Sequence, residues 1–272
     1  MPLAFPGTRA QLSTHIQLLI HCNPVWFWNQ ALTDFIFIIF LPLRFTSFFI
    51  LDLNWANTLS STITSFHMFS STFFLITISV DHCILMKCPE WAWNHRTAPL
   101  AFIMGLGMWV LSLGFSLRYG DLWESDLSPA STSLNFRGDE RRVKATIAIQ
   151  FLVGFLIPLA LILIPTFYIV LAAKMRRNRL IQSTKPLKIL LDLIPTFFLC
   201  WLPYHVVVFL LMSANYPLSL LNRGRAFAYV LTYFSSCLNP ILYLTIEEEF
   251  LRYYQHACNC QTTDNLGSEL VG

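Results

Sequence analysis

Asp34 is the most unusual polar residue of this sequence, because it stands in the middle of an apolar run, Phe27–Leu51. A carboxylate in hydrocarbon is costly, and by default it faces other protein segments and a partner. Other apolar runs offer it polar partners, namely Ser71, Ser235, Ser236 and Asn239. Such a carboxylate would hold a sodium ion or share a proton, and the alternative is a tolerated acid without a role.

Two proline motifs predict kinks inside apolar helices. One is Cys200-Trp201-Leu202-Pro203, and the other is Asn239-Pro240 followed one turn later by Tyr243. A proline in a helix removes one backbone hydrogen bond and its ring clashes with the preceding turn, so the helix bends. Trp201 beside the first kink would change rotamer as the helix swings, which predicts a switch. The alternative is an ordinary structural kink.

The end of the chain has the pattern of a membrane-surface helix. Glu247–Glu249 precede the aromatic stretch Phe250–Tyr254, and acids favour a helix N-terminus while the aromatic rings would lie in the membrane interface. Cys258 and Cys260 follow at positions suited to palmitoylation. The alternative is that both are reduced thiols without a role.

The composition places these residues in a membrane protein. Of the 272 residues, 55% are hydrophobic and 12% are charged, about half of the ~25% charged fraction that is typical of soluble domains. The mean hydropathy is +0.55. These values exclude a soluble enzyme and a disordered chain. The net charge of +3 is too small to indicate a nucleic-acid partner.

Six segments are long and apolar enough to cross a bilayer, which takes about 20 residues. Backbone polar groups in lipid must be satisfied within the segment, so all six are predicted to be helices. The predicted fold is therefore an all-α polytopic transmembrane helix bundle in the lipid bilayer. The segments are Phe27–Leu51, Ser61–Met86, Pro99–Leu117, Ala145–Ala173, Leu187–Ser213 and Ala226–Ile246.

The chain divides into three predicted regions. Residues 1–26 form an atypical N-terminal segment that neither spans the membrane nor matches a signal peptide. Residues 27–246 form the transmembrane bundle, and residues 247–272 form the cytoplasmic amphipathic helix and tail. No internal repeat is visible, which argues against a transporter built from inverted halves.

A membrane enzyme is the competing class of protein. Enzymes that modify lipids often need histidine clusters for metal, but the seven histidines of this chain include no His-x-x-x-His pair. Asp34, Asp81 and Asp192 are scattered and form no paired carboxylate site. We therefore predict no enzyme activity, no catalytic residue and no metal site.

Taken together, the motifs resemble a rhodopsin-family (class A) G-protein-coupled receptor. The resemblance rests on the motifs at Asp34, Trp201–Pro203 and Asn239–Tyr243, with Trp109 and Pro158 at the landmark positions of their spans. Ile78-Ser79-Val80-Asp81, followed by the segment Pro89–Thr97, is similar to the chemoattractant branch. That branch holds the formyl-peptide receptors and the related orphan receptor that responds to resolvins and lipoxins.

The resemblance implies an orientation and a mechanism. Asp81–Thr97 would face the cytoplasm, and the connector Arg118–Lys144 would face outward in a multi-pass protein of the cell membrane. A lipid or peptide ligand, whose identity the sequence does not specify, would bias Trp201 and swing the fifth span outward. The opened cavity would admit a heterotrimeric G protein, with Asp81, His82, Cys83, Trp201, Pro203, Asn239, Pro240 and Tyr243 as the switch and coupling residues.

Charge at the outer end offers one indication of the ligand. Arg44, with Arg118 and either Arg223 or Arg225, would attract an acidic lipid or a peptide carboxylate. The alternative is that these arginines are ordinary interfacial anchors.

The chain departs from the family in two respects that bear on signalling. Six spans are present where the family has seven, so the pattern is that of a truncated, pseudogene-like receptor. Asp81-His82-Cys83 stands where the family has Asp-Arg-Tyr, and histidine cannot replace a permanent guanidinium fork. The alternative to a signalling receptor is a non-signalling decoy, or a product of a decaying gene that is retained in the endoplasmic reticulum.

Overall fold

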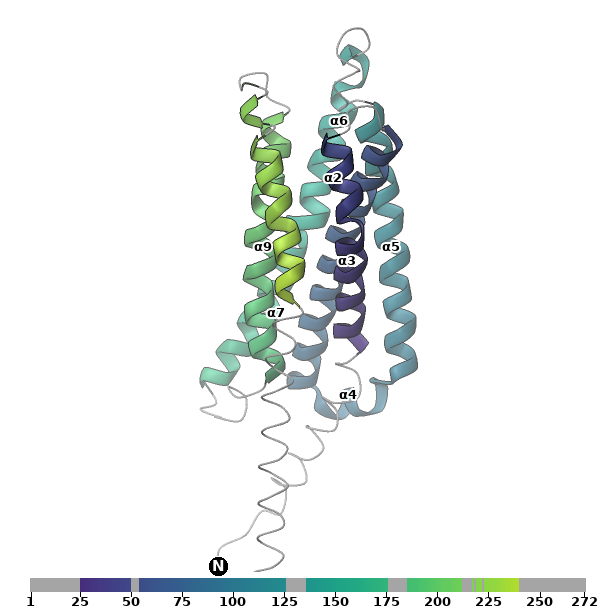
Figure 1. Ribbon diagram of the computed structural model, residues 1–272. Helices are drawn as coiled ribbons and strands as arrows, with labels where there is room; N and C mark the ends of the chain where they lie inside the picture. Colours follow the sequence, from purple (N-terminus) through teal and green to yellow (C-terminus); the bar gives the residue numbers. More distant parts are fainter. Residues whose placement is uncertain are drawn as a thin grey trace, which may run out of the picture.

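The computed structural model describes residues 25–49, 54–125, 136–175, 185–211, 217, 219–221 and 223–239. Every regular element in this part of the chain is helical, and the long helices run side by side along one axis (Figure 1). The predicted all-α helix bundle is confirmed. Several predicted features lie outside the described residues, namely Pro240, Tyr243, the helix Phe250–Tyr254, Cys258 and Cys260.

The helices agree closely with the predicted spans. Five described helices are long and apolar enough to cross a membrane: Val25–Thr46, Thr58–Leu85, Pro99–Leu117, Lys144–Leu171 and Leu191–Leu210. The sixth predicted span, Ala226–Ile246, is helical over its described part. The elements are a first helix at 25–39, α2 (Leu41–Phe49), α3 (Asn54–Lys87), α4 (Pro89–His95), α5 (Ala98–Ser125), α6 (Phe136–Phe151), the π-helical segment η2 (Leu152–Leu156), α7 (Ile157–Met175), α9 (Lys185–Leu211) and a last helix at 223–239.

The predicted outer connector, Arg118–Lys144, is helical over its described residues, 118–125 and 136–144. α5 continues to Ser125 and α6 already begins at Phe136, so both helices project beyond their apolar spans (Figure 1). Neither extension contains a proline, and a helix can continue in water wherever its backbone bonds are kept within the segment.

Prolines account for the irregular points of two helices. A turn at Phe40 separates the first helix from α2, and Pro42 two residues later has no N–H and a ring that crowds the preceding turn. In the fourth span, η2 ends at Leu156, two residues before Pro158, and the missing N–H of the proline favours a local π-type turn. Both irregular points therefore lie within two residues of a proline.

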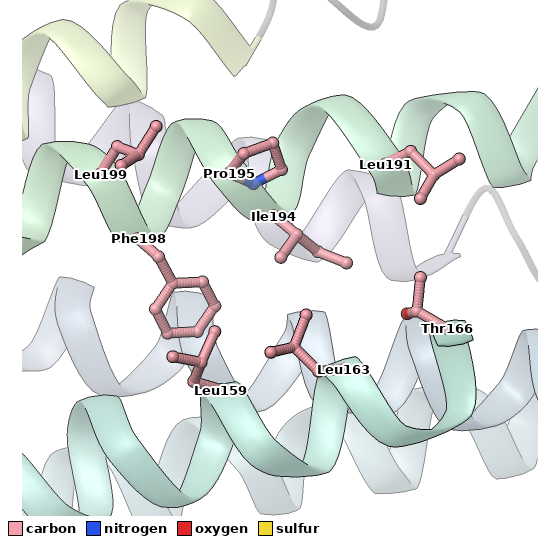
Figure 2. Close-up of a pocket in the computed structure, with 8 residues that line it drawn as sticks. All are labelled: Leu159, Leu163, Thr166, Leu191, Ile194, Pro195, Phe198 and Leu199. Carbon is pink, nitrogen blue, oxygen red and sulfur yellow. The ribbon is translucent and has the colours of Figure 1, made fainter. Parts of the chain in front are cut away.

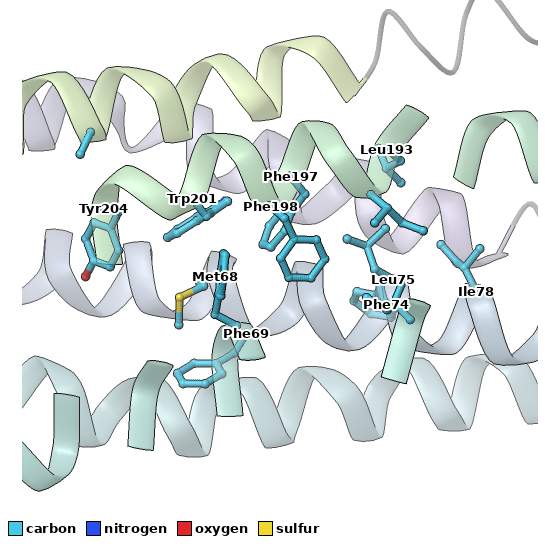
Figure 3. Close-up of a cluster of buried hydrophobic side chains, with 14 of the residues drawn as sticks. Met68, Phe69, Phe74, Leu75, Ile78, Leu193, Phe197, Phe198, Trp201 and Tyr204 are labelled. Carbon is cyan, nitrogen blue, oxygen red and sulfur yellow. The ribbon is translucent and has the colours of Figure 1, made fainter. Parts of the chain in front are cut away.

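α3 is the central helix, because it contacts α2, α5, α7 and α9. Its side chains Met68, Phe69, Phe74 and Leu75 are fully buried. They belong to one buried cluster with Phe197, Phe198 and Trp201 of α9 (Figure 3), and Phe69 contacts Phe115 of α5. α5 instead presents its apolar side chains outward, with Phe102 64% and Ile103 68% exposed. A water-facing helix would not expose such a surface, so this face is suited to lipid.

An apolar groove of about 330 Å³ lies between α7 and α9. Leu163, Leu191 and Leu199 on its walls are exposed on the outside of the bundle, so the groove opens toward the lipid. Pro195 and Thr166 face it from opposite sides (Figure 2). The two helices are therefore incompletely packed along this stretch.

Gly154 in η2 gives a test of how closely the fourth span approaches α3. A Cβ atom at this position would lie 2.5 Å from Met68 Cε and 3.2 Å from Phe69 Cε1, and both of these side chains are fully buried. Gly154→Ala is therefore expected to lower the apparent Tm of the purified protein by several degrees, as overpacking costs about 1–3 kcal/mol.

Gly114→Ala is the matched control, since a Cβ atom there meets nothing within 4 Å. Thermal unfolding monitored by tryptophan fluorescence would compare the two variants. An unchanged Tm for Gly154→Ala would contradict the close helix contact.

Candidate functional site

The carboxylate of Asp34 is fully buried and joins three helices. The first helix carries Asp34, and α3 places His67 Nε2 at 2.9 Å from Asp34 Oδ1. From the last helix, Asn239 Nδ2 donates a hydrogen bond to Asp34 Oδ2 at 2.8 Å. Both carboxylate oxygens therefore have a partner on another helix, which a buried carboxylate requires.

His67 Nε2 is the centre of a small polar cluster. Ser236 Oγ lies 3.1 Å from it and Ser71 Oγ lies 3.3 Å from it, while Gln30 Nε2 donates to Ser71 Oγ at 3.0 Å. Ser71 and Ser236 thus reach Asp34 through the imidazole. Ser235 is also buried, but its hydroxyl has no hydrogen-bond partner among the described residues.

A stack of aromatic rings fixes the imidazole in place. The ring of His67 is stacked on Phe37 with 4.1 Å between centroids, and Phe37 is stacked on Tyr233 at 4.1 Å. The ring of His67 also lies 5.8 Å from that of the fully buried Trp201, measured between centroids. Trp201 stands two residues before the half-buried Pro203, so His67 connects this part of α9 to the Asp34 cluster.

Ring contacts continue from Trp201 toward the end of the bundle opposite α4. Trp201 contacts Tyr204 with 5.5 Å between centroids, and Tyr204 contacts Tyr229 at 5.8 Å. The guanidinium of Arg44 lies 3.6 Å over the Tyr229 ring and donates from Nη1 to Ser60 Oγ at 3.2 Å. A cation over an aromatic face is held there electrostatically.

Arg225 lies near enough to Arg44 for the two positive charges to interact. Burial lowers the pKa of Arg225, and the positive charge of Arg44 acts in the same direction. Two guanidiniums therefore share one end of the bundle, a concentration of positive charge suited to an anion. Arg223 is exposed, which settles that Arg225 is the arginine facing inward, and the side chain of Arg118 lies outside the described residues.

A second polar site lies at the α4 end of the bundle. Arg96, which directly follows α4, donates from Nε to Asp81 Oδ1 at 2.8 Å and from Nη2 to Asp81 Oδ2 at 2.7 Å. This bidentate pair is the strongest type of side-chain ion pair. In the sequence, Arg96 stands out only as part of the segment Pro89–Thr97. Its role as the partner of Asp81 could not be predicted from that segment.

His82 does not take part in this ion pair. Its ring is 4% exposed, and its Nε2 has no hydrogen-bond partner within the described residues. Cys83 beside it is a half-buried free thiol. Asp81 and Arg96 thus pair with each other without His82, which is buried inside the helix bundle.

The sequence did not identify three members of the central cluster, namely Gln30, Phe37 and His67. One signal was available for His67, because it precedes Ser71 by four residues and so lies on the same face of a helix. Gln30 precedes Asp34 by four residues in the same way. Helical spacing shows which face these residues share, but it does not show which helix that face meets.

The central cluster does not fit a sodium ion as the described residues are arranged. A hard cation of this kind takes oxygen ligands, and His67 Nε2 already stands among the nearest oxygens, which belong to Asp34, Ser71 and Ser236. For other metals, the described part of the chain contains no group of three histidine, cysteine or acidic residues that could hold an ion.

Comparison with known proteins supplies a family. The family model described as "7 transmembrane receptor (rhodopsin family)" matches residues 20–243. The chain is 35% identical to chemerin-like receptor 1 of Mus musculus over 257 residues, which cover 85% of this chain and 68% of that protein. It is 30% identical to N-formyl peptide receptor 3 of Pongo pygmaeus over 257 residues, covering 84% and 72% respectively. Formyl peptide receptor 2 of Mus musculus is 28% identical over 267 residues.

The Asp81–Arg96 pair can be tested by double substitution. Arg96→Ala leaves a mostly buried carboxylate with its main partner removed, and breaking such a pair costs about 3–5 kcal/mol. The apparent Tm of Arg96→Ala is therefore expected to fall clearly. Asp81→Asn combined with Arg96→Ala removes both charges and should recover most of the loss. If the double variant is as unstable as the sum of the single variants, the two side chains are not coupled.

Proposed function

Because the chain belongs to the rhodopsin family of seven-transmembrane receptors, and to its chemoattractant branch, we propose that it is a ligand-driven receptor of the cell membrane that signals through a heterotrimeric G protein. The predicted resemblance to this branch is confirmed. The chain is accordingly a membrane receptor and not an enzyme. The proposal adds that a ligand drives the receptor, that the receptor couples to a G protein and that it is located at the cell surface.

One observation carries the proposal, namely the unbroken series of contacts from the arginine end of the bundle to the kink of α9. The series runs from Arg44 through Tyr229 and Tyr204 to Trp201. It continues along α9 from Trp201 to Phe197 at 5.6 Å. A ligand that displaces the outer members would change the packing of Trp201, and packed rings of this kind tend to have discrete arrangements rather than continuous ones.

The outer arginines indicate the chemistry of the ligand. Arg44 and Arg225 bring two positive charges to the expected outer end, beside the rings of Tyr204 and Tyr229. A carboxylate would be attracted to such a site, and guanidinium groups bind carboxylates in a bidentate manner. An amphipathic peptide or lipid with one acidic group fits this combination of charge and aromatic surface.

The inner half of α9 has the freedom that an outward swing requires. Pro195 and Pro203 both lie inside α9, and each removes a backbone hydrogen bond that would stiffen the helix. The groove between α7 and α9 leaves these helices incompletely packed around Pro195 and Thr166, where the family usually has a tyrosine in place of Thr166. Ligand binding would shift the population between the closed and the swung arrangement.

Arg96 supplies part of what the family arginine supplies elsewhere. It neutralises Asp81 in this arrangement, so no positive charge is needed at the position of His82 to pair with this carboxylate. A buried neutral imidazole gives a G protein less to bind than a guanidinium does. Coupling is therefore expected to be weaker than in relatives with Asp-Arg-Tyr.

His82→Arg is expected to raise agonist-driven or basal G-protein activation, because it adds a permanent charge with a planar fork at the coupling position. His82→Lys is the matched control, since it adds the charge without the fork and should restore less. Activation would be measured as nucleotide exchange on purified G protein at equal receptor amounts.

Surface exposure must be known for each of these variants. An epitope inserted between Pro129 and Ala130 would be labelled on intact and on permeabilised cells. Labelling of intact cells supports the proposed orientation and location. Labelling only after permeabilisation, or no gain from His82→Arg at the surface, would leave the non-signalling alternative standing.

Arg225→Ala is expected to raise the EC50 of an acidic agonist about 10-fold or more, because a charged hydrogen bond contributes about 1.5–3 kcal/mol. The first probes are chemerin and N-formyl peptides, which appear in the names of the relatives. Each active peptide would be compared with its C-terminal amide, which lacks the carboxylate. Arg223→Ala is the control, since Arg223 is exposed, and equal losses for both variants would contradict a specific carboxylate site.

A further inference from the structure

We propose that His67 takes the place of a bound cation at Asp34, so that this bundle binds no sodium there and links its helices through its own imidazole. The inference rests on the geometry of the central cluster and is independent of ligand and G protein. It concerns the site for which the sequence had suggested a sodium ion.

The position of the imidazole nitrogen is the first argument. His67 Nε2 lies 2.9 Å from Asp34 Oδ1, 3.1 Å from Ser236 Oγ and 3.3 Å from Ser71 Oγ. These three oxygens come from the first helix, the last helix and α3. A cation shared by the same oxygens would have to occupy the space that Nε2 already fills.

The hydrogen-bonding chemistry around Asp34 is the second argument. Asp34 Oδ1 faces the ring nitrogen and Oδ2 accepts the N–H of Asn239. A cation is repelled by N–H groups and needs several oxygen ligands at once. With both carboxylate oxygens directed toward nitrogens, neither of them is left open to a cation in this arrangement.

The immobility of the ring is the third argument. His67 is 2% exposed, and its ring is stacked nearly parallel to Phe37, with 10° between planes. Trp201 is stacked with it as well, with 5.8 Å between centroids and 23° between planes. A buried ring with two aromatic neighbours has little room to move, so a sodium ion would have to displace packed side chains to reach Asp34.

The proposal has a consequence for the switch. A diffusible ion would make the arrangement of the three helices depend on the sodium concentration, because a ligand stabilises the state that binds it. A side chain is present at all times and is covalently attached. The arrangement around Trp201 should therefore be insensitive to sodium.

The test compares the apparent Tm of the full-length purified protein in sodium chloride and in N-methyl-D-glucamine chloride of equal ionic strength. The wild-type protein is expected to show the same Tm in both salts. His67→Asn removes the ring and offers an amide oxygen, so sodium can reach Asp34. A sodium concentration ten times Kd would then raise Tm by about 3–6 °C in a chain of this size.

Matched variants keep the result interpretable. His205→Asn replaces another buried histidine, which lies in α9 and contacts the rings of Phe151 and Phe155. This variant should lower Tm equally in both salts. Adding Asp34→Asn to His67→Asn should abolish the sodium response. If His67→Asn does not fold, His67→Ala serves in its place, because it also leaves the three oxygens open.

Two results would overturn the proposal. One is a sodium-specific rise in Tm of the wild-type protein that Asp34→Asn abolishes, which would show that the ion binds beside the imidazole. The other is the absence of a sodium response in both folded His67 variants, which would show that the ring is not what excludes the ion. Neither result depends on signalling, so the proposed receptor function is tested separately from this proposal.

Discussion

The buried carboxylate of Asp34 limits how three helices of this bundle can pack together. A charged group in a low-dielectric interior must be satisfied by partners, and here those partners come from two other helices. His67 and Asn239 bind the two carboxylate oxygens. The first helix, α3 and the last helix are therefore held at one rotation and one height relative to one another. The hydrophobic surroundings alone would not specify that register, since lipid is as apolar as the side chains.

The same cluster connects the polar interior to the aromatic one. His67 is both a hydrogen-bond partner of Asp34 and a member of the ring stack that includes Phe37 and Trp201. A change in the packing of Trp201 would thus alter the contacts of the Asp34 carboxylate. A change in those contacts would in turn alter the packing of α9 beside Pro203. This shared residue gives the proposed switch a physical connection across the middle of the bundle.

At the α4 end of the bundle, Arg96 neutralises the carboxylate of Asp81. The family pattern places an arginine directly after the acid, and this chain has His82 there. Arg96 reaches the same carboxylate from beyond α4. The charge of Asp81 is neutralised in either arrangement, but the guanidinium belongs to a different segment. The guanidinium that neutralises Asp81 therefore comes from beyond α4 and not from the residue next to the acid.

The helical spans, the positions of the helix prolines and the family could be predicted from the sequence, because these depend on local apolar length, on residue type and on motifs. Asn239 could also be predicted as a partner of Asp34, since few polar residues occur in the spans. The central position of His67 and the inward position of Arg225 in place of Arg223 could not be predicted in this way. Helical spacing defines which residues share a face, but the rotation and stagger of each helix arise from packing against its neighbours. The Asp81–Arg96 pair could not be predicted for the same reason, because the path of the chain through α4 brings Arg96 back to Asp81.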